Sequence, residues 1–433
     1  MTLGALLDAA QAAAPGWRRL TPTQRGERLR RTADALEARL QDMTMAIVES
    51  VDKPVREARA EAQRAVAIFR YAAGQGSAPI GSQWPTDDPE TMVHTVRVPL
   101  GVVALITPFN FPVAIPAWKL APALLGGNAV VLKPASVAAA PARLLLEAAY
   151  EGGVPGDVVQ LLDGPGSAGQ ALVEDPGIDA LSFTGSAAVG RRLAMICAER
   201  GIRAQLELGG KNSSIVLADA DLAAVARDVA AAAYGFAGQK CTATARVLVA
   251  AEVADEFREL LAAATITFPV GPAVEESTLC GPVITAAKAA ELRDVVAAHD
   301  VAAQAPAPAG DRFVAPALLE GVGDGDPAWN EELFGPVLVS RTVDGLESAL
   351  ELANGGPYGL SAAIYTRSSA AVRAAMASLR AGVVAVNRPS TGLDPHVPFG
   401  GVRASGSVAR EQGPAGVLFY TEEHTVYWRE QGA

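Results

Sequence analysis

The sequence predicts an α/β protein with two or three domains. Its 433 residues, half of them hydrophobic, exceed what one simple core accommodates. From about residue 101 onward, short apolar runs alternate with helix-like segments, a pattern that predicts parallel βαβ units. Residues 1 to about 75 read instead as consecutive helices. The chain therefore divides into a helical start and a long α/β region.

The helical start has clear local signals. Thr21 is placed to cap a helix whose first position is Pro22. Apolar residues then recur at helical intervals, at Leu29, Ala33, Leu36 and Leu40. Residues 76–101 change character, because a turn-rich stretch is followed by alternating residues, which indicates a β-hairpin.

The α/β region is expected to place ligands at one edge of a sheet. Its predicted strands cover 101–110, 128–135, 158–164, 180–186 and further segments within 204–221. Its predicted helices cover 114–127, ending at a Gly-Gly pair, then 140–153 and 187–200. Ligands of parallel α/β sheets gather at the carboxyl ends of the strands.

A second α/β passage is predicted from about 210 to 400. Within it, the low-complexity stretch 301–312 is interpreted as a surface connector. The tail 419–430 alternates and is expected to form a strand at an edge or a subunit interface.

Composition argues against several classes of function. The net charge of −11 gives no support to nucleic-acid binding, and no apolar run is long enough to span a membrane. The N-terminal stretch contains Asp8 and no basic segment, so it does not resemble a secretory signal. The chain has three cysteines, an odd number, and none of them forms a C-x-x-C pair. So few cysteines favour a reducing cytoplasm. The four histidines also lack the spacing of metal ligands, so no metal site is expected.

Two turns after predicted strands hold candidate binding groups. In "TPFNFP" (107–112), Asn110 offers an amide N–H donor, although a simple Asx-turn explains it as well. In "FTGSAAVG" (183–190), Gly185 permits close approach to the backbone and Ser186 begins a helix. A helix N-terminus suits a phosphate, but a plain capping turn is the alternative.

Two further residues could carry chemistry. Glu207 in "LELGGKN" lies among leucines, so its pKa should be raised if it is buried, as a general base requires, unless it simply faces solvent. Cys241 in "FAGQKCTATAR" has small neighbours, and a helix N-terminus beside it would stabilise a thiolate. Most intracellular cysteines are inert, and Cys197 and Cys280 fit that description.

Together these segments resemble the aldehyde dehydrogenase superfamily over almost the whole chain. The matching stretches, in order, are "TPFNFP", "AWKLAPALLGGNAVVLKPA", "FTGS", "LELGGK", "GQKCTATAR", "EELFGPV", "NGGPYGLSAAIYT" and "PFGGVRASG". The resemblance implies a Rossmann-type cofactor domain (1–79 and 100–208) and an α/β catalytic domain (209–416). It also implies a small β oligomerisation element (80–99 and 417–433) that joins dimers or tetramers.

The resemblance implies catalytic roles for specific residues. Cys241 would attack the aldehyde, giving a thiohemiacetal and then a thioester. The amide of Asn110 and the backbone N–H of Cys241 would form the oxyanion hole, and Glu207 would activate the hydrolytic water. Lys119 and Glu422 match positions of a proton relay behind Glu207.

The resemblance also implies cofactor contacts. Thr107 and Pro108 would line the channel, Gly185 and Ser186 would meet the pyrophosphate, and Lys133 would contact the adenosine ribose. Glu332 and Phe334 would hold and flank the nicotinamide ribose.

Two positions depart from the common family pattern. Phe109 replaces a frequent tryptophan, which should change packing rather than mechanism. Ser136 stands where NAD-preferring members often carry glutamate. Without that negative charge, and with Lys133 nearby, the expected cofactor is NADP or NAD, with NADP favoured.

The implied substrate is a small aldehyde. The stretches "TPFNFPVAIPAWKLAPAL", "GQKCTAT" and "STGLDPHVPFGG" most resemble the 2,5-dioxopentanoate (α-ketoglutarate semialdehyde) dehydrogenase branch. A basic residue should then line the mouth of the site, with His396 as a candidate. Aromatic aldehydes and succinate semialdehyde stay open as alternatives. A CoA-acylating enzyme is disfavoured by Glu207, and a non-catalytic relative by the retention of Cys241, Asn110 and Glu207 together.

Overall fold

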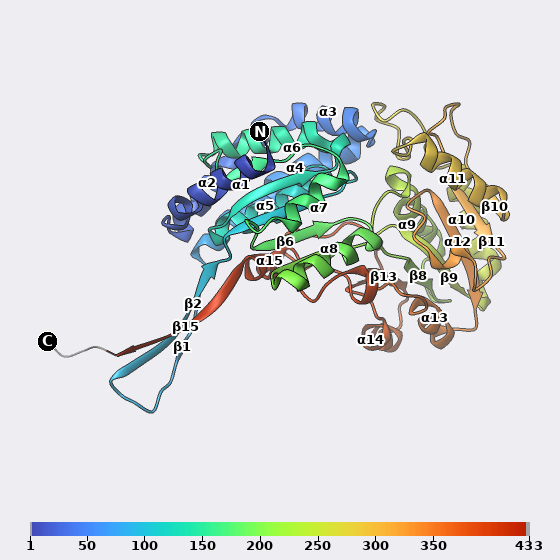
Figure 1. Ribbon diagram of the computed structural model, residues 1–433. Helices are drawn as coiled ribbons and strands as arrows, with labels where there is room; N and C mark the ends of the chain where they lie inside the picture. Colours follow the sequence, from blue (N-terminus) through green and yellow to red (C-terminus); the bar gives the residue numbers. More distant parts are fainter. Residues whose placement is uncertain (1, 430–433) are drawn as a thin grey trace.

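The computed structural model, which describes residues 2–429, has two α/β lobes and a projecting arm (Figure 1). The first lobe contains the helices coloured blue to green around one sheet, and the second contains elements coloured from yellow-green to red-brown around another. The arm extends away from the first lobe and carries the C-terminal strand. The α/β prediction is therefore confirmed.

The first lobe is built on a parallel five-stranded sheet in the order β5-β4-β3-β6-β7. Its strands are β3 (Val102–Thr107), β4 (Ala129–Pro134), β5 (Val159–Leu161), β6 (Ala180–Thr184) and β7 (Arg203–Glu207). The chain proceeds outward from β3 to β5 and then resumes on the other side of β3 with β6. The strand order thus reverses between β3 and β6, which is where such sheets bind ligands.

Both faces of this sheet are covered by helices. Val103 and Leu105 face one apolar cluster with helices from 22 to 151, whereas Val102 and Ala104 face another that includes α1, α7 and α8. Burial on both sides explains why β3 is apolar at every position before Thr107. The helices are α1 (Leu3–Arg18), α2 (Pro22–Ala38), α3 (Leu40–Val51), α4 (Val55–Gly74), α5 (Ala114–Gly126), α6 (Ala139–Glu151), α7 (Gly166–Glu174) and α8 (Ala187–Arg200).

The signals at the start of α2 behave as predicted. The Thr21 side chain accepts from the Gln24 N–H while Gln24 accepts from the Thr21 N–H, a reciprocal capping box. Leu29 and Leu36 are buried on the inner face of the helix. Leu40, predicted to continue the same stripe, instead begins α3.

The second lobe contains a seven-stranded sheet in the order β10-β11-β12-β9-β8-β13-β14. The strands are β8 (Asn212–Val216), β9 (Thr244–Ala250), β10 (Asp300–Gln304), β11 (Ala317–Glu320), β12 (Val337–Val343), β13 (Ser361–Tyr365) and β14 (Val383–Val386). Only β10 runs antiparallel to its neighbour. The connector predicted at 301–312 is therefore wrong over 301–304. Four of the five β10 residues are exposed, so this edge strand lacks an apolar pattern.

Helices cover this sheet, and the last helix of the chain packs against the first lobe. The helices are α9 (Leu222–Tyr234), α10 (Ala254–Ile266), α11 (Ala286–Ala297), α12 (Pro327–Asn330), α13 (Leu346–Ala353), α14 (Ser369–Ser378) and α15 (Gly413–Phe419), the last of which packs on α5. Short 3₁₀ turns are η1 (Gln75–Ser77), η2 (Ser136–Ala138), η3 (Gly235–Gly238), η4 (Ala251–Val253) and η5 (Arg403–Ser405).

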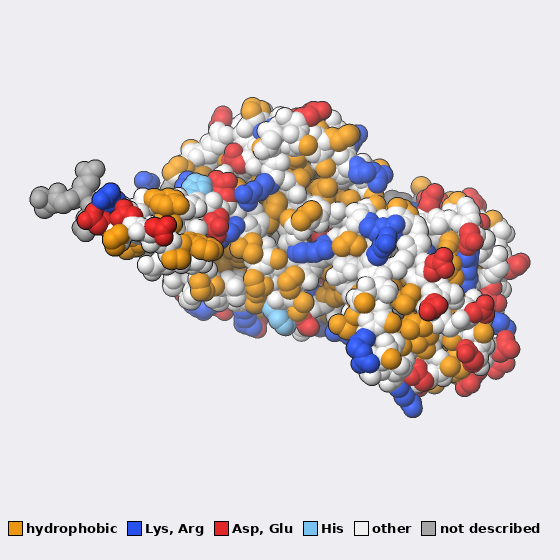
Figure 2. Space-filling view, turned by 90° about the horizontal axis from the view of Figure 1, so that it is seen from below, with side chains coloured by type: hydrophobic (Ala, Val, Ile, Leu, Met, Phe, Trp, Pro, Cys, Tyr) orange, Lys and Arg blue, Asp and Glu red, His pale blue; other side chains and the backbone are white. Residues whose placement is uncertain are grey.

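The arm is an antiparallel sheet of β1 (Gln83–Trp84), β2 (Thr91–Pro99) and β15 (Thr421–Arg429). The predicted hairpin and the predicted C-terminal strand are both confirmed, whereas Glu430, the last residue of the predicted tail, lies outside the described residues. Figure 2 shows apolar side chains gathered on this arm. Among residues 2–429, no helix has the length and apolar character needed to cross a membrane.

A short link near residue 208 joins the two large sheets. β7 ends at Glu207, and β8 begins only a few residues later at Asn212. Because that link is short, the carboxyl edge of the first sheet faces the amino edge of the second. The three sheets fall within 100–208, within 209–416, and within 80–99 with 417–429. The assignment of cofactor binding, catalysis and oligomerisation to these segments stays a prediction.

Candidate active site

Cys241 lies on a hydrogen-bonded loop between α9 and β9. Phe236, Ala237 and Gly238 all adopt left-handed backbone conformations, with φ of 52°, 52° and 66°. The Phe236 N–H donates to the Leu279 carbonyl at 2.9 Å, and the Ile284 N–H donates to the Gln239 side chain at 2.9 Å. These two bonds from outside the loop hold it in its strained turn.

Asn110 is brought directly to this loop. It follows β3 in the "TPFNFP" turn, and its side chain is 2% exposed. Its Nδ2 donates to the carbonyl of Gln239, two residues before Cys241, at 2.9 Å. The Asn110 Oδ1 has no hydrogen-bond partner among the described residues, so the local Asx-turn interpretation does not hold. The amide instead links β3 of the first lobe to the Cys241 loop of the second.

Cys241 is half-buried and lines a cavity of about 310 Å³. Burial raises the pKa of its thiol, and the carboxylates of Glu332 and Glu207 raise it further. No helix begins at this residue, because the next element is strand β9 at Thr244. The expected thiolate stabilised by a helix N-terminus is therefore wrong, and the thiol needs a base to lose its proton.

Glu207 is buried at the end of β7 and does not face solvent. It is 2% exposed, and its Oε2 accepts from the Gly401 N–H at 3.3 Å, while its Oε1 has no partner among the described residues. Burial raises its pKa well above the ordinary value, and nearby Glu411 adds to the effect. The raised pKa expected from the sequence is confirmed. Phe399, two residues before Gly401, lines the Cys241 cavity.

Lys119 and Glu411 form a buried ion pair behind Glu207. The Lys119 Nζ also donates to Ser182 Oγ at 2.8 Å, and that hydroxyl donates to Gln205 Oε1 at 2.8 Å. The predicted partner, Glu422, does not belong to this group. Its side chain is 44% exposed on the arm and approaches Arg203 at 3.7 Å. The acid that pairs with Lys119 behind Glu207 is therefore Glu411.

The crevice between β3 and β6 has unsatisfied polar groups. The hydroxyls of Thr107 and Thr184, at the carboxyl ends of these adjacent strands, are buried without a hydrogen-bond partner among the described residues. Gly185 follows Thr184, and its N–H donates to the Glu207 carbonyl at 3.1 Å. Ser186 then caps α8, but its side chain makes no capping hydrogen bond. This helix N-terminus thus has donors available for an anion.

Lys133 and Ser136 lie together at the end of β4. The Lys133 Nζ donates to the carbonyls of Gly164 and Pro134, at 2.9 and 3.0 Å, and Ser136 Oγ donates to Gly164 at 2.8 Å. Burial lowers the pKa of Lys133. The two side chains share one carbonyl acceptor, and Ser136 itself is exposed.

Glu332 and Phe334 lie between the lobes. Glu332 accepts from the Gly210 N–H at 3.1 Å, and burial raises its pKa to about 7. The rings of Phe334 and Phe109 meet edge to face, with centroids 5.9 Å apart. Pro108, beside Phe109, is half-buried on the same loop. The residues at 107–109 and 332–334 thus form adjacent walls.

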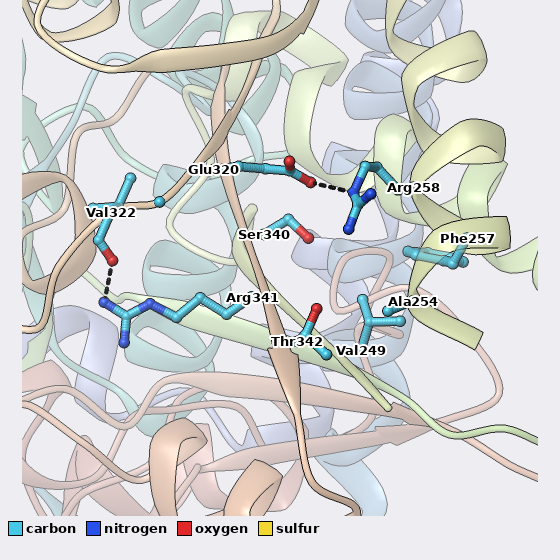
Figure 3. Close-up of a pocket in the computed structure, with 10 residues that line it drawn as sticks. Val249, Ala254, Phe257, Arg258, Glu320, Val322, Ser340, Arg341 and Thr342 are labelled. Carbon is cyan, nitrogen blue, oxygen red and sulfur yellow. Dashed lines mark hydrogen bonds and ion pairs between the residues drawn. The ribbon is translucent and has the colours of Figure 1, made fainter. Parts of the chain in front are cut away.

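A separate hollow of about 380 Å³ lies in the second lobe (Figure 3). Arg258 and Arg341 line it, but Arg258 donates to Glu320 at 3.0 Å and Arg341 is paired with Asp324. No predicted site residue lines this hollow. Its charges are already neutralised, so it offers no reactive group.

Sequence reasoning missed residues that only the fold brings to the site. Glu411 follows Arg410 in an unremarkable polar stretch, and nothing local distinguishes it from other acids. The one available signal was Lys119 within an apolar helix, which requires a buried acidic partner somewhere. His396, proposed for a substrate carboxylate, does not line the Cys241 cavity, and its ring lies 6.3 Å from that of Tyr71.

A parallel sheet with unpartnered polar groups at its switch point, close to a half-buried cysteine and a buried glutamate, is the arrangement of a class of cofactor-dependent enzymes. A model described as the aldehyde dehydrogenase family matches residues 2–426. The chain belongs to the aldehyde dehydrogenase family, as its motifs predicted, and it is an aldehyde-oxidising oxidoreductase.

Similar proteins and structures support this assignment. An alpha-ketoglutaric semialdehyde dehydrogenase from Bacillus subtilis is 39% identical, over 97% of this chain and 88% of its own length. A benzaldehyde dehydrogenase [NAD(+)] from Pseudomonas putida is 34% identical, over 99% and 89%. The structure of betaine aldehyde dehydrogenase from Staphylococcus aureus in complex with NAD+ aligns with a TM-score of 0.94 at 28% identity, covering 99% and 87%.

Proposed function

We propose that the protein oxidises 2,5-dioxopentanoate, or a closely similar semialdehyde, to the carboxylic acid with NADP or NAD. One observation carries the proposal. The amide of Asn110, the thiol of Cys241 and the carboxylate of Glu207 come from three distant parts of the sequence and converge between the two sheets. Similar proteins from Bacillus subtilis, and from Haloferax volcanii at 39% identity, are alpha-ketoglutarate semialdehyde dehydrogenases by name.

The chemistry begins at Cys241. Once its thiol proton has passed to solvent, the sulfur forms a bond to the aldehyde carbon while the carbonyl π bond breaks, and the resulting oxyanion accepts hydrogen bonds from the Asn110 Nδ2 and the Cys241 backbone N–H. A nicotinamide cofactor, when bound, supplies the hydride acceptor that turns the thiohemiacetal into a thioester. Glu207, whose raised pKa suits a general base, then removes a proton from the water that hydrolyses the thioester. The Lys119–Glu411 pair takes part in moving that proton away.

The residues at the switch point fit a dinucleotide. The unpartnered hydroxyls of Thr107 and Thr184, and the free side chain of Ser186 at the start of α8, are groups that phosphate oxygens would satisfy. Glu332 would accept from the nicotinamide ribose. Ser136 adds no negative charge at the adenosine ribose, which supports acceptance of NADP. The Staphylococcus aureus relative is a complex with NAD+, so NAD is the alternative.

Benzaldehyde is the second candidate substrate. It is favoured by the Pseudomonas putida relative and by the aromatic rings of Phe111, Trp118 and Phe399 around the cavity. Aromatic walls of this kind accept a flat ring as readily as a methylene chain.

The function is tested by turnover of 2,5-dioxopentanoate, succinate semialdehyde and benzaldehyde with each cofactor, followed through the absorbance of the reduced cofactor. We expect the highest kcat/KM with 2,5-dioxopentanoate and no requirement for coenzyme A. Cys241→Ala should abolish turnover, whereas Cys197→Ala, a buried cysteine on α8, should retain it. Substantial oxidation by Cys241→Ala would show that another group is the nucleophile.

We also propose that two or four copies assemble through the arm. Its exposed apolar side chains include Trp84, Met92, Tyr427 and Trp428, between 46 and 74% exposed. Such a cluster on a projecting sheet is typical of a surface that another protein covers. The three cysteines carry free thiols, which supports a reducing compartment such as the cytoplasm.

A further inference from the structure

The cavity that Cys241 lines has a wall with unused hydrogen-bond donors. Arg64, Trp118 and Gln412 all line it. The Nε of Arg64, the Nε1 of Trp118 and the Nε2 of Gln412 are buried and have no hydrogen-bond partner among residues 2–429. Each of these atoms is a donor, and buried donors without acceptors are costly. The wall therefore lacks acceptors, which an occupant of the cavity would have to supply.

The charged residues around the cavity also indicate that its occupant would be an acceptor with negative charge. Lys240 is paired with Glu57 at 2.8 Å. Glu61 is paired with the buried Lys53. Arg64 makes no ion pair with any residue in the described part of the chain, so the lining carries one uncompensated positive charge.

The neighbours of Arg64 do not neutralise it. Its one side-chain hydrogen bond is a long one, from Nη2 to Gln412 Oε1 at 3.4 Å, and its guanidinium lies 6.0 Å from the Trp118 ring. Glu61 is already occupied, because its Oε1 accepts from the Val113 and Ala114 N–H groups at 2.9 and 3.0 Å. Asp394 attracts Arg64 from a distance, but it is exposed on a loop.

We propose that Arg64, assisted by Trp118 and Gln412, binds a carboxylate at the far end of the aldehyde and so selects semialdehydes of 2-oxo acids. The inference rests on the proposed oxidation at Cys241 and names the residue that recognises its substrate. A guanidinium presents a planar fork that matches a carboxylate.

The substrate's other groups fit the same cavity. The 2-oxo acid end of the substrate presents only acceptor oxygens, on its carboxylate and on the neighbouring ketone. These acceptors match the donors of Arg64, Trp118 and Gln412. The short methylene chain between that end and the aldehyde would lie against Phe111, Ile115 and Phe399. An uncharged aldehyde would fill the apolar part but leave the donors of Arg64 unsatisfied.

The test compares two substrates of equal chain length, 2,5-dioxopentanoate and pentanal. Arg64→Met should lower kcat/KM for 2,5-dioxopentanoate by at least about 30-fold, mostly through KM, because a buried charged contact is lost. Its kcat/KM for pentanal should stay within about threefold or rise. Arg64→Lys should recover part of the loss, since it restores the charge without the fork.

Matched controls separate recognition from structure. Arg59→Met changes an arginine on the same helix that pairs with Glu276 at the surface, and both substrates should be unaffected. Trp118→Phe keeps the ring but removes the N–H donor, and should selectively weaken 2,5-dioxopentanoate. Equal losses on both substrates with Arg64→Met would overturn the proposal in favour of a structural role, as would no loss at all. Failure of the wild-type protein to oxidise either aldehyde would instead contradict the proposed function.

Discussion

At the residue scale, burial rather than a neighbouring positive charge sets the protonation of the site. Burial is the largest cause of the raised pKa of Cys241, Glu207 and Glu332 alike, and the two carboxylates raise the pKa of Cys241 further. A negative charge on Glu207 or Glu332 therefore makes ionisation of the Cys241 thiol harder. Because burial disfavours its charged form, Glu207 must first lose its own proton before it can act as the base that activates the hydrolytic water.

Glu207→Gln should separate the two halves of the reaction. Glutamine keeps the size of the side chain but cannot accept a proton, so thioester hydrolysis should slow by about 10²–10⁴-fold. Formation of the thioester should be less affected, and stopped-flow absorbance should then show a burst of reduced cofactor close to one per active site. An unchanged steady state without a burst would remove Glu207 from this role.

Glu411 and Glu422 give a matched comparison for the proton path. Glu411→Gln should slow steady-state turnover and destabilise the protein, because it leaves Lys119 buried without its ion-pair partner. Glu422→Gln, on the exposed arm, should change neither turnover nor the midpoint of urea unfolding. The reverse result would restore the partner that the sequence suggested.

Ser136→Glu tests cofactor choice at a single exposed position. A carboxylate there would repel a 2′-phosphate and accept hydrogen bonds from the ribose hydroxyls of NAD. We expect the ratio of kcat/KM for NADP to that for NAD to fall by at least about tenfold. Ser136→Gln, which adds a side chain of the same length without charge, is the control. If the ratio does not move, the argument from Ser136 is wrong.

At the element scale, the loop before β9 shows why a glycine stands three residues before Cys241. Three consecutive left-handed residues turn the chain sharply, and only Gly238 among them escapes the penalty of a side chain. Gly238 also packs on Gly335, where an added Cβ would come within 2.5 Å of the carbonyl carbon. The loop that carries Cys241 therefore packs directly against the segment that carries Phe334.

Gly238→Ala should therefore lower the free energy of unfolding by more than the left-handed backbone conformation alone would explain. Gly201 provides the control, because its φ of 67° is nearly the same but nothing lies within 4 Å of an added Cβ. Gly201→Ala should destabilise by about 1 kcal/mol, the ordinary cost of a left-handed alanine. Gly238→Ala should cost about 3 kcal/mol or more by urea unfolding and should reduce kcat. Equal costs would show that the contact with Gly335 is unimportant.

At the scale of the whole molecule, the sequence predicted what periodicity and local signals encode. The alternating strands and helices, the cap at Thr21 and the hairpin before residue 100 all follow from local patterns. The edge strand β10 was missed because it has almost no apolar face. The pairing of Glu411 with Lys119 and the lack of an ion-pair partner for Arg64 among residues 2–429 could not be predicted, because both depend on which other charges the fold brings together. Cys241 was predicted as the nucleophile. The burial of its side chain could not be inferred from the sequence, so the raised pKa of its thiol could not be predicted either.

The arm allows the last prediction, which concerns assembly. β15 pairs with β2 along one edge only, and its other edge has no partner strand among residues 2–429, so another copy could add to it. Trp428, 57% exposed on β15, would then be covered, and Trp428→Glu should lower the molar mass measured by light scattering toward that of one chain. Met376→Glu, at a 66% exposed position on α14, should leave the mass unchanged. An unchanged mass for Trp428→Glu, or a monomeric wild-type protein, would contradict assembly through this strand.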